Sequence, residues 1–195
     1  MVGPFEADGA GTPLDPQERE GLIPTYVTTR EQLNELEAKN ILEAIGWAFE
    51  RKRNVTDEVF LRGLHRRMFR KVWRWAGRYR TTERNLGALP HRIQVDLYAV
   101  LDNARYWIAN KTFPPDEIAV RFHHGLVFVH PFANGNGRWS RLAADILIVQ
   151  SGGDRFSWGG GADLQKIGDD RARYIAALQK ADHHDLGPLI KFARS

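Results

Sequence analysis

The chain of 195 residues is long enough for one domain with a substantial core, and its 43% hydrophobic and 27% charged residues are ordinary for a globular protein. It contains no cysteine, which excludes disulfides, thiolate metal sites and a cysteine nucleophile and agrees with a cytoplasmic, reducing location. The net charge is +4, and no apolar run approaches the ~20 residues of a membrane helix, so we expect no membrane partner.

The N-terminal residues 1–28 are rich in Gly, Pro, Thr and Asp and have no sustained periodicity, so they predict an irregular arm with one helical turn at 16–20, which is a candidate regulatory segment. From there on, residues 29–195 are assigned to a single helical domain. The first helix is capped by Thr28 or Thr29. Its apolar positions fall near a 3.6-residue period: Leu33, Leu36, Ile41, Leu42, Ile45 and Phe49.

Similar periodicity and stop signals predict the remaining helices, with bounds near 56–73, 93–108, 114–130, 134–150, 162–181 and 186–194. Pro131 ends the fourth helix, because proline disfavours helical geometry in the residue before it. The segment 75–90 is interrupted by glycines and a proline and predicts a loop or a short hairpin. No other stretch shows the alternation typical of strands, so the fold class is all-α.

The stretch from His130 to Arg141, HPFANGNGRWSR, concentrates groups that carry chemistry. It joins the end of one predicted helix to the start of the next. Histidine titrates near pH ~6.5 and is the most common general base, so His130 is a candidate proton acceptor. The structural alternative for His130 is a core or capping histidine.

A glycine turn and two arginines follow the histidine. Gly135, Asn136 and Gly137 precede a helix, where backbone N–H groups without partners bind phosphate readily. Arg138 and Arg141 are three residues apart, so their guanidinium groups share one helix face and can reach the same phosphate chain. The alternative for the two arginines is a pair of solvated surface residues.

These residues resemble the signature of the Fic/Doc family, which is His, any residue, Phe, any residue, Asp or Glu, Gly-Asn-Gly-Arg, two spacers and Arg. The matching positions are His130, Phe132, Gly135, Asn136, Gly137, Arg138 and Arg141. The segment 75–80 resembles the family's lead-in to a flap, and the arm resembles the branch called mobile mystery protein B. The resemblance implies a Fic-fold helical bundle with a short β-hairpin flap.

The resemblance also implies an activity, the transfer of AMP from ATP and Mg²⁺ to a Ser, Thr or Tyr hydroxyl of a target protein. In that activity His130 would deprotonate the hydroxyl, and the backbone of residues 135–137 would bind the phosphates. Arg138 and Arg141 would lie on the β and γ groups. Such proteins include toxin-like members held by an antitoxin-like regulator.

One residue departs from the family signature. Asn134 stands where the family has the Asp or Glu that holds Mg²⁺. An amide oxygen brings a dipole and no net charge, so weaker metal binding and slow transfer are expected. Alternatively, Asn134 caps the following helix, which asparagine does well. A catalytically weak or silent protein that binds a nucleotide or a partner is therefore the second functional hypothesis.

The arm holds a further candidate, since many relatives carry an inhibitory helix with Ser or Thr, three residues, and Glu followed by Gly or Asn. Here Glu20 and Gly21 match that pattern, but Pro16 replaces the Ser or Thr. A regulatory pairing of Glu20 with Arg141 is one hypothesis. The alternative is that Glu20 lies on a solvated turn.

Basic residues are concentrated between positions 62 and 80, at Arg62, Arg66, Arg67, Arg70, Lys71, Arg74, Arg78 and Arg80. Basic residues with neighbouring aromatics can bind nucleic acid. Such a run is more often the solvated face of an amphipathic helix, so nucleic acid is not the expected partner.

Overall fold

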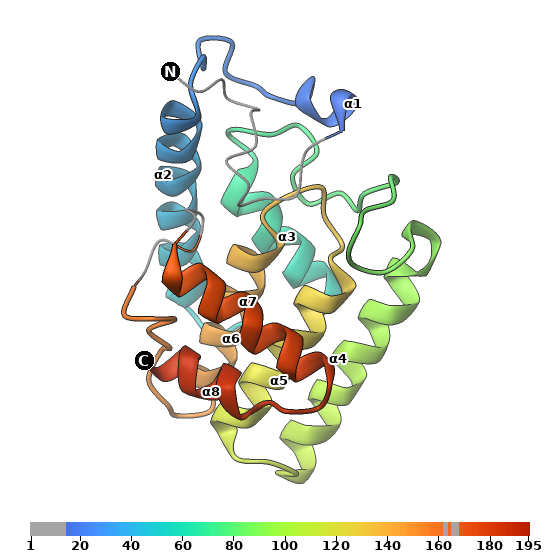
Figure 1. Ribbon diagram of the computed structural model, residues 1–195, viewed down its shortest axis with the longest axis vertical. Helices are drawn as coiled ribbons and strands as arrows, with labels where there is room; N and C mark the ends of the chain where they lie inside the picture. The colour runs from blue at the N-terminus through green and yellow to red at the C-terminus, as the bar shows by residue number, and fades with distance from the viewer. Residues whose placement is uncertain (1–14, 162–163, 165–167) are drawn as a thin grey trace.

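The computed structural model describes residues 15–161, 164 and 168–195, and in these the fold is helical (Figure 1). Its helices are α1 (Pro16–Arg19), α2 (Arg30–Phe49), α3 (Glu58–Phe69), the 3₁₀ turn η1 (Pro90–Arg92), α4 (Ile93–Asn110), α5 (Pro115–Val129), α6 (Asn136–Gln150), α7 (Asp169–Asp182) and α8 (Gly187–Arg194). The described residues contain no strand, only two isolated β-bridges, Leu22–Trp73 and Tyr79–Phe132. The all-α prediction is confirmed, and no described helix has the length and apolarity to span a bilayer.

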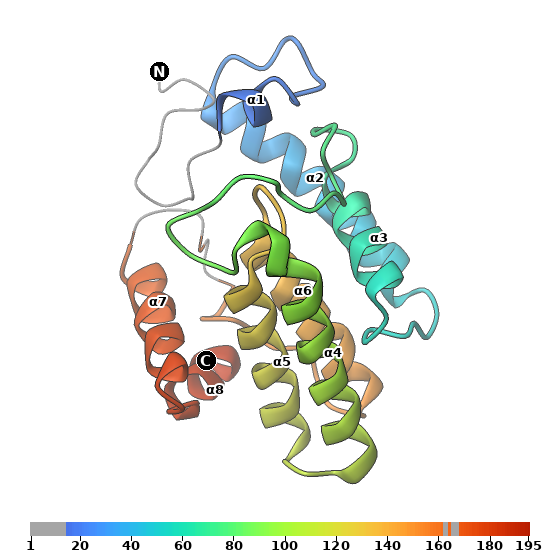
Figure 2. The same cartoon turned by 90° about the vertical axis from the view of Figure 1, so that its right-hand side faces the viewer.

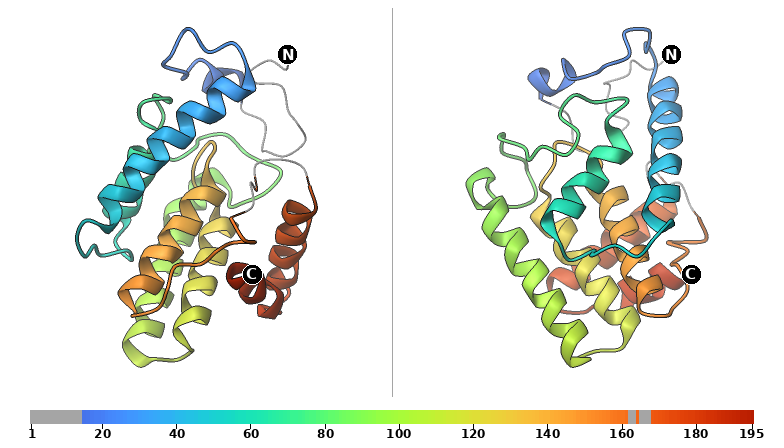
Figure 3. Two further views of the ribbon diagram at one scale, coloured as in Figure 1. Left: turned by 90° about the vertical axis from the view of Figure 1, so that its left-hand side faces the viewer. Right: turned by 180° about the vertical axis from the view of Figure 1, so that it is seen from behind.

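The helices form three layers, seen edge-on in Figure 3, where α5 and α6 lie between the α2–α3 pair and the α7–α8 pair. Helix α4 runs antiparallel beside α5 (Figure 2). The central helix α6 is buried over most of its length, and its buried residues include the large apolar side chains of Trp139 and Ile148. The N-terminus of this central helix therefore has a fixed position in the fold.

Most predicted helix bounds are close to those observed, and Thr29 rather than Thr28 caps α2. The second helix is an exception, because α3 stops at Phe69. The side chain of Asn40 in α2 ends it, donating from Nδ2 to the Arg67 carbonyl at 2.7 Å and accepting the Lys71 N–H at 3.1 Å. Residues 162–163 and 165–167 of the sixth predicted helix lie outside the described residues, and α7 begins at Asp169.

The buried face of α2 differs from the predicted one. Its buried residues are Leu33, Glu37, Asn40, Ala44 and Ala48. Leu42, predicted to be in the core, is 68% exposed. The polar residues Glu37 and Asn40 lie on the inner face because each has hydrogen-bond partners on other elements, which apolar periodicity alone cannot reveal.

Residues 79–89 form an irregular loop, so of the two structures predicted for 75–90 the loop is observed and the β-hairpin flap is not confirmed. The loop has no ladder of backbone hydrogen bonds, but the N–H groups of Arg80 and Ala88 donate to the carbonyls of Pro131 at 3.0 Å and Val129 at 3.1 Å, and the buried Arg80 side chain adds further bonds. Arg80 donates from Nε to the His130 carbonyl at 2.8 Å. Its two other nitrogens donate to the carbonyls of Thr82 at 2.8 Å and Ala88 at 2.5 Å. This arginine clamp fixes the loop against the end of α5.

Three histidines are kept neutral inside the fold. Burial lowers the pKa of His65 to about 3, that of His130 to about 4, and that of His123 well below its ordinary value. The unfolded chain binds protons near pH ~6.5 while the folded chain does not, so we expect the free energy of unfolding to fall as the pH drops below ~6.5. Each histidine contributes a slope of about 1.4 kcal/mol per pH unit between its folded and unfolded pKa values.

Urea denaturation at pH 7, 6 and 5 measures this slope. Replacing the exposed His91 by Gln is the matched control and should leave the slope unchanged, whereas His123→Gln should reduce it. A free energy of unfolding that stays constant between pH 7 and 5 would contradict the prediction.

Candidate functional site

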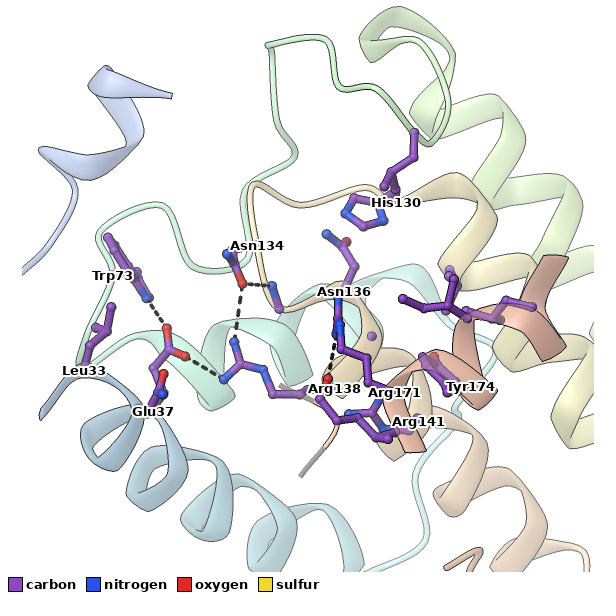
Figure 4. Close-up of a pocket in the computed structure, with 18 of the residues that line it drawn as sticks. Leu33, Glu37, Trp73, His130, Asn134, Asn136, Arg138, Arg141, Arg171 and Tyr174 are labelled. Carbon is purple, nitrogen blue, oxygen red and sulfur yellow. Dashed lines mark hydrogen bonds and ion pairs between the residues drawn. The ribbon is translucent and has the colours of Figure 1, made fainter. Parts of the chain in front are cut away.

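A cavity of about 310 Å³ lies at the N-terminus of α6, between α2 and α7 (Figure 4). Every predicted catalytic, nucleotide-binding and metal-binding residue lines it, namely His130, Asn134, Gly135, Asn136, Gly137, Arg138 and Arg141. The structure therefore brings together the side chains that the sequence grouped only by proximity along the chain.

His130 ends α5 in a left-handed conformation, with φ of 51°. The loop held by Arg80 covers this histidine so closely that a Cβ on Gly87 would lie 2.5 Å from the His130 Cβ. Burial, and then the positive charge of Arg80, lowers the pKa of His130 to about 4. Its Nδ1 is buried and has no hydrogen-bond partner among the described residues. The imidazole is consequently neutral at pH 7 and able to accept a proton.

Gly135 begins α6 and leaves its N-terminus open. It has a φ of 79°, and no side chain caps the helix. A Cβ at this position would lie 2.5 Å from Phe69, so glycine is required both by conformation and by contact. The N–H groups at the start of α6 carry partial positive charge and face the cavity, which suits an anion.

The Asn136 side chain stabilises the turn that precedes α6. It accepts the Phe132 N–H at 2.9 Å and donates to the Phe132 carbonyl at 2.8 Å. The residue is only 2% exposed, so it locks the turn between α5 and α6. Only the backbone of Asn136 remains available to a phosphate.

Asn134 is held among hydrogen-bond donors. Its Oδ1 accepts the Gly135 N–H at 2.5 Å and faces Arg138 Nη2 at 3.4 Å (Figure 4). The capping alternative is wrong, because the N-cap is Gly135 and Asn134 precedes it. An oxygen that already accepts from donors beside a guanidinium is poorly placed to bind Mg²⁺, which favours carboxylates. No group of three or more His, Cys, Asp or Glu side chains within the described ranges is arranged for a metal.

Arg138 is bound to a carboxylate that the sequence did not single out. Its Nη1 lies 2.6 Å from Oε2 of Glu37 on α2, and Oε1 of the same carboxylate accepts the Trp73 Nε1–H at 2.6 Å. Glu37 is only 5% exposed. A glutamate four residues after Leu33 on a buried helix face is the signal that could have found it. Glu37 thus holds one of the two signature arginines within the pocket.

Arg141 contacts Tyr174 of α7, with its guanidinium carbon 5.4 Å from the ring centroid. The Tyr174 hydroxyl lies 3.0 Å from Nε2 of the buried His123. Arg30 and Arg171 also line the cavity. No local sequence signal indicated either arginine, because both lie on elements distant from residues 130–141. With Arg138 and Arg141 they surround the space with positive charge, which favours an anionic ligand.

Within the described part of the arm, residues 15–28, Glu20 does not pair with Arg141. Glu20 is exposed and does not line the cavity. Glu18 is the engaged carboxylate. It forms an ion pair with Arg84, and it accepts from the Thr82 hydroxyl at 3.1 Å. The predicted regulatory pairing of Glu20 is therefore absent from this structure, and the arm contacts the loop above His130 instead.

The basic run is divided between surface and interior. Arg80 is buried in the clamp, and Arg67 stacks on Trp47 at 4.1 Å. Lys71 pairs with Glu43. The other members are exposed, which agrees with a solvated helix face.

Comparison with known protein families shows which family this part of the chain resembles. Residues 55–148 match the Fic/DOC family, and this range holds α3 to α6 and the whole segment from His130 to Arg141. Residues 55–148 form a Fic/DOC domain. The matches do not distinguish a branch within the family, so the resemblance to mobile mystery protein B stays a prediction.

Relatives of this Fic/DOC domain include the protein adenylyltransferase Fic of Nematostella vectensis, which is 31% identical over 124 residues, or 60% of this chain and 26% of the relative. The chain thus spans about a quarter of that curated relative. A Fic-1 fragment from C. elegans superposes with a TM-score of 0.65 at 25% identity, covering 90% of this chain and 51% of the fragment. BepC of Bartonella tribocorum, with bound AMPPNP, shares the fold at a TM-score of 0.69 and 18% identity, covering 92% of this chain and 97% of BepC.

Proposed function

We propose that this protein transfers AMP from ATP to a hydroxyl side chain of a target protein. The observation that carries the proposal is a single cavity that holds a neutral His130, the open N-terminus of α6, and Arg138 with Arg141. The relatives named as protein adenylyltransferases, and the AMPPNP bound by the structurally similar BepC, support the same reaction class.

The nucleotide would be held by its phosphates. Residues 135–137 line the cavity at the N-terminus of α6, where backbone N–H groups would bind phosphate, and Arg141 on the next turn would reach the end of the same phosphate chain. Gly137 leaves space beside Arg141, because a Cβ there would be 3.5 Å from Nη1. Since the residues at Asn134 do not form a metal site, we derive no step that depends on Mg²⁺.

His130 would take the proton from the target hydroxyl as that oxygen attacks the α-phosphorus. The new O–P bond forms, the bond from the α-phosphorus to the bridging oxygen breaks, and pyrophosphate leaves with that oxygen. Positioned N–H donors and arginines stabilise the charge on the phosphates without reorganising. The proton resides on the imidazole until solvent removes it.

Labelled ATP tests the proposal directly. The protein is incubated with a lysate and ATP labelled at either the α or the γ phosphate. Label retained on protein only from the α position is expected for AMP transfer. Label only from the γ position would indicate phosphotransfer and would overturn the proposal, as would the absence of label from both.

The second candidate is a protein that binds nucleotide with little or no transfer. Two contacts favour it: Glu37 occupies Arg138, and Asn134 supplies no carboxylate. The Glu37 contact reduces the positive charge that Arg138 offers to a phosphate. The Asn134 amide lowers the affinity for the metal ion that productive binding of a triphosphate requires.

Replacing Glu37 by Gln distinguishes the two candidates. The amide keeps an acceptor for the Trp73 Nε1–H but removes the negative charge that competes with phosphate for Arg138. We expect the affinity for ADP, measured by titration calorimetry, to rise about tenfold. A rise in the rate of α-label transfer in the same variant would mean that Glu37 restrains an active enzyme.

Glu43→Gln is the matched control, since Glu43 lies on the same helix and pairs with the exposed Lys71. It should leave the affinity for ADP unchanged. An equal or weaker affinity in Glu37→Gln would show that the ion pair does not compete with the nucleotide.

A further inference from the structure

His65 of α3 lies directly beneath the turn that carries the site. It is fully buried, and its ring stacks on Phe132 with centroids 3.7 Å apart and planes inclined by 17°. It also packs against Phe69 and against the edge of Trp139. The imidazole therefore has a fixed orientation in the core, one layer below the cavity.

Both ring nitrogens of His65 contact backbone groups of known polarity. Nε2 lies 3.0 Å from the Asn134 carbonyl oxygen, which can only accept, so Nε2 must carry the proton. Nδ1 lies 3.0 Å from the Gly77 N–H, which can only donate, so Nδ1 must be bare. The two contacts together determine a single neutral tautomer.

The hydrogen bond from Nε2 decides which way one peptide faces. In a trans peptide the carbonyl and the following N–H point in opposite directions. The Asn134 carbonyl points down to His65, so the Gly135 N–H points up to the cavity. There Asn134 Oδ1 accepts the Gly135 N–H. The same oxygen also faces Arg138 Nη2, so it lies between two donors. A phosphate oxygen would find the same two donors.

We propose that His65 is a positioning residue of the anion site: its Nε2–H holds the Asn134 carbonyl in the core and thereby aims the Gly135 N–H at the ligand. The proposal deepens the nucleotide-binding function proposed above and rests on it for the identity of the ligand. His65 touches neither nucleotide nor target, and acts through the Asn134–Gly135 peptide alone.

Two amide variants separate the two hydrogen bonds. The side-chain amide of Gln reaches the position of Nε2, so His65→Gln keeps a donor for the Asn134 carbonyl. The shorter amide of Asn reaches only the position of Nδ1, so His65→Asn keeps an acceptor for the Gly77 N–H. We expect the Kd for ADP to change little in His65→Gln and to increase about tenfold in His65→Asn.

Urea denaturation measures how much each variant lowers the free energy of unfolding. The two decreases should be similar, because each variant loses one hydrogen bond and the aromatic stack. Equal ADP affinities for the two variants, or a weaker affinity only in His65→Gln, would overturn the proposal. If neither variant folds, the wild type decides through the ¹⁵N shifts of the His65 ring. A protonated Nδ1 would overturn the proposal, and a protonated Nε2 with a bare Nδ1 is the expected result.

An NMR measurement on the Gly135 amide without nucleotide tests the positioning role of His65 independently of the proposed function. If wild-type protein does not bind ADP, the proposed nucleotide site fails. The ¹H–¹⁵N shift and hydrogen exchange of Gly135, recorded without ligand, should still change in His65→Asn and stay near wild type in His65→Gln. An unchanged Gly135 amide in both folded variants would overturn the positioning role.

Discussion

Replacing His130 by alanine is expected to lower the rate of AMP transfer by about 10²–10⁴-fold, because general-base catalysis contributes that much. Binding of ADP should change little, since the phosphate donors lie on α6. The measurement is the rate of α-label transfer together with the Kd for ADP. His124→Ala is the matched control on the same helix, where His124 pairs with Asp182 at 2.7 Å away from the cavity lining.

The lowered pKa of His130 gives the same experiment a second readout. Since the imidazole stays neutral down to about pH 4, wild-type kcat/KM should not follow the usual histidine titration near pH ~6.5. Residual transfer in His130→Ala equal to that of wild type would rule out His130 as the base. A titration of kcat/KM near pH 6.5 would show that the imidazole is less enclosed than the fold indicates.

Replacing Gly135 by alanine should lower the free energy of unfolding by about 2–4 kcal/mol, from left-handed strain and overpacking together. The added methyl would lie 2.5 Å from Phe69 at a φ of 79°. Gly137→Ala is the matched control two residues on, where the nearest atom would be 3.5 Å away and φ is not positive. Alanine inside a helix is intrinsically favoured, so this variant should be as stable as wild type or slightly more so.

Urea denaturation measures the free energy of unfolding of both variants, and titration with ADP measures their affinities for the nucleotide. Gly137→Ala should fold normally yet bind ADP more weakly, because its methyl enters the space beside Arg141. If the two variants lose the same stability, the left-handed turn at Gly135 is not the constraint described.

The sequence predicted that the catalytic and anion-binding candidates lie together, because they belong to one short segment where local geometry determines their proximity, and all of them line one cavity. It missed Glu37 because that residue is 101 positions away from Arg138 in the chain. Apolar periodicity placed Leu42 in the core because it treats every leucine alike, whereas Asn40 and Glu37 determine which face of α2 turns inward. The sequence left a loop and a hairpin open for 75–90 for a similar reason, since nothing local to Arg80 indicates that its side chain will bind three carbonyls.

The contact between the arm and the loop bears on how the chain can be divided. Arg84 and Glu18 have side chains only 8% and 13% exposed, and the Glu18 carbonyl accepts the Trp75 Nε1–H at 3.0 Å. A fragment beginning at residue 29 would keep the guanidinium of Arg84 and lose its carboxylate, leaving a nearly enclosed charge uncompensated. We therefore expect such a truncation to loosen the cover over His130, although the described residues 15–28 do not line the cavity.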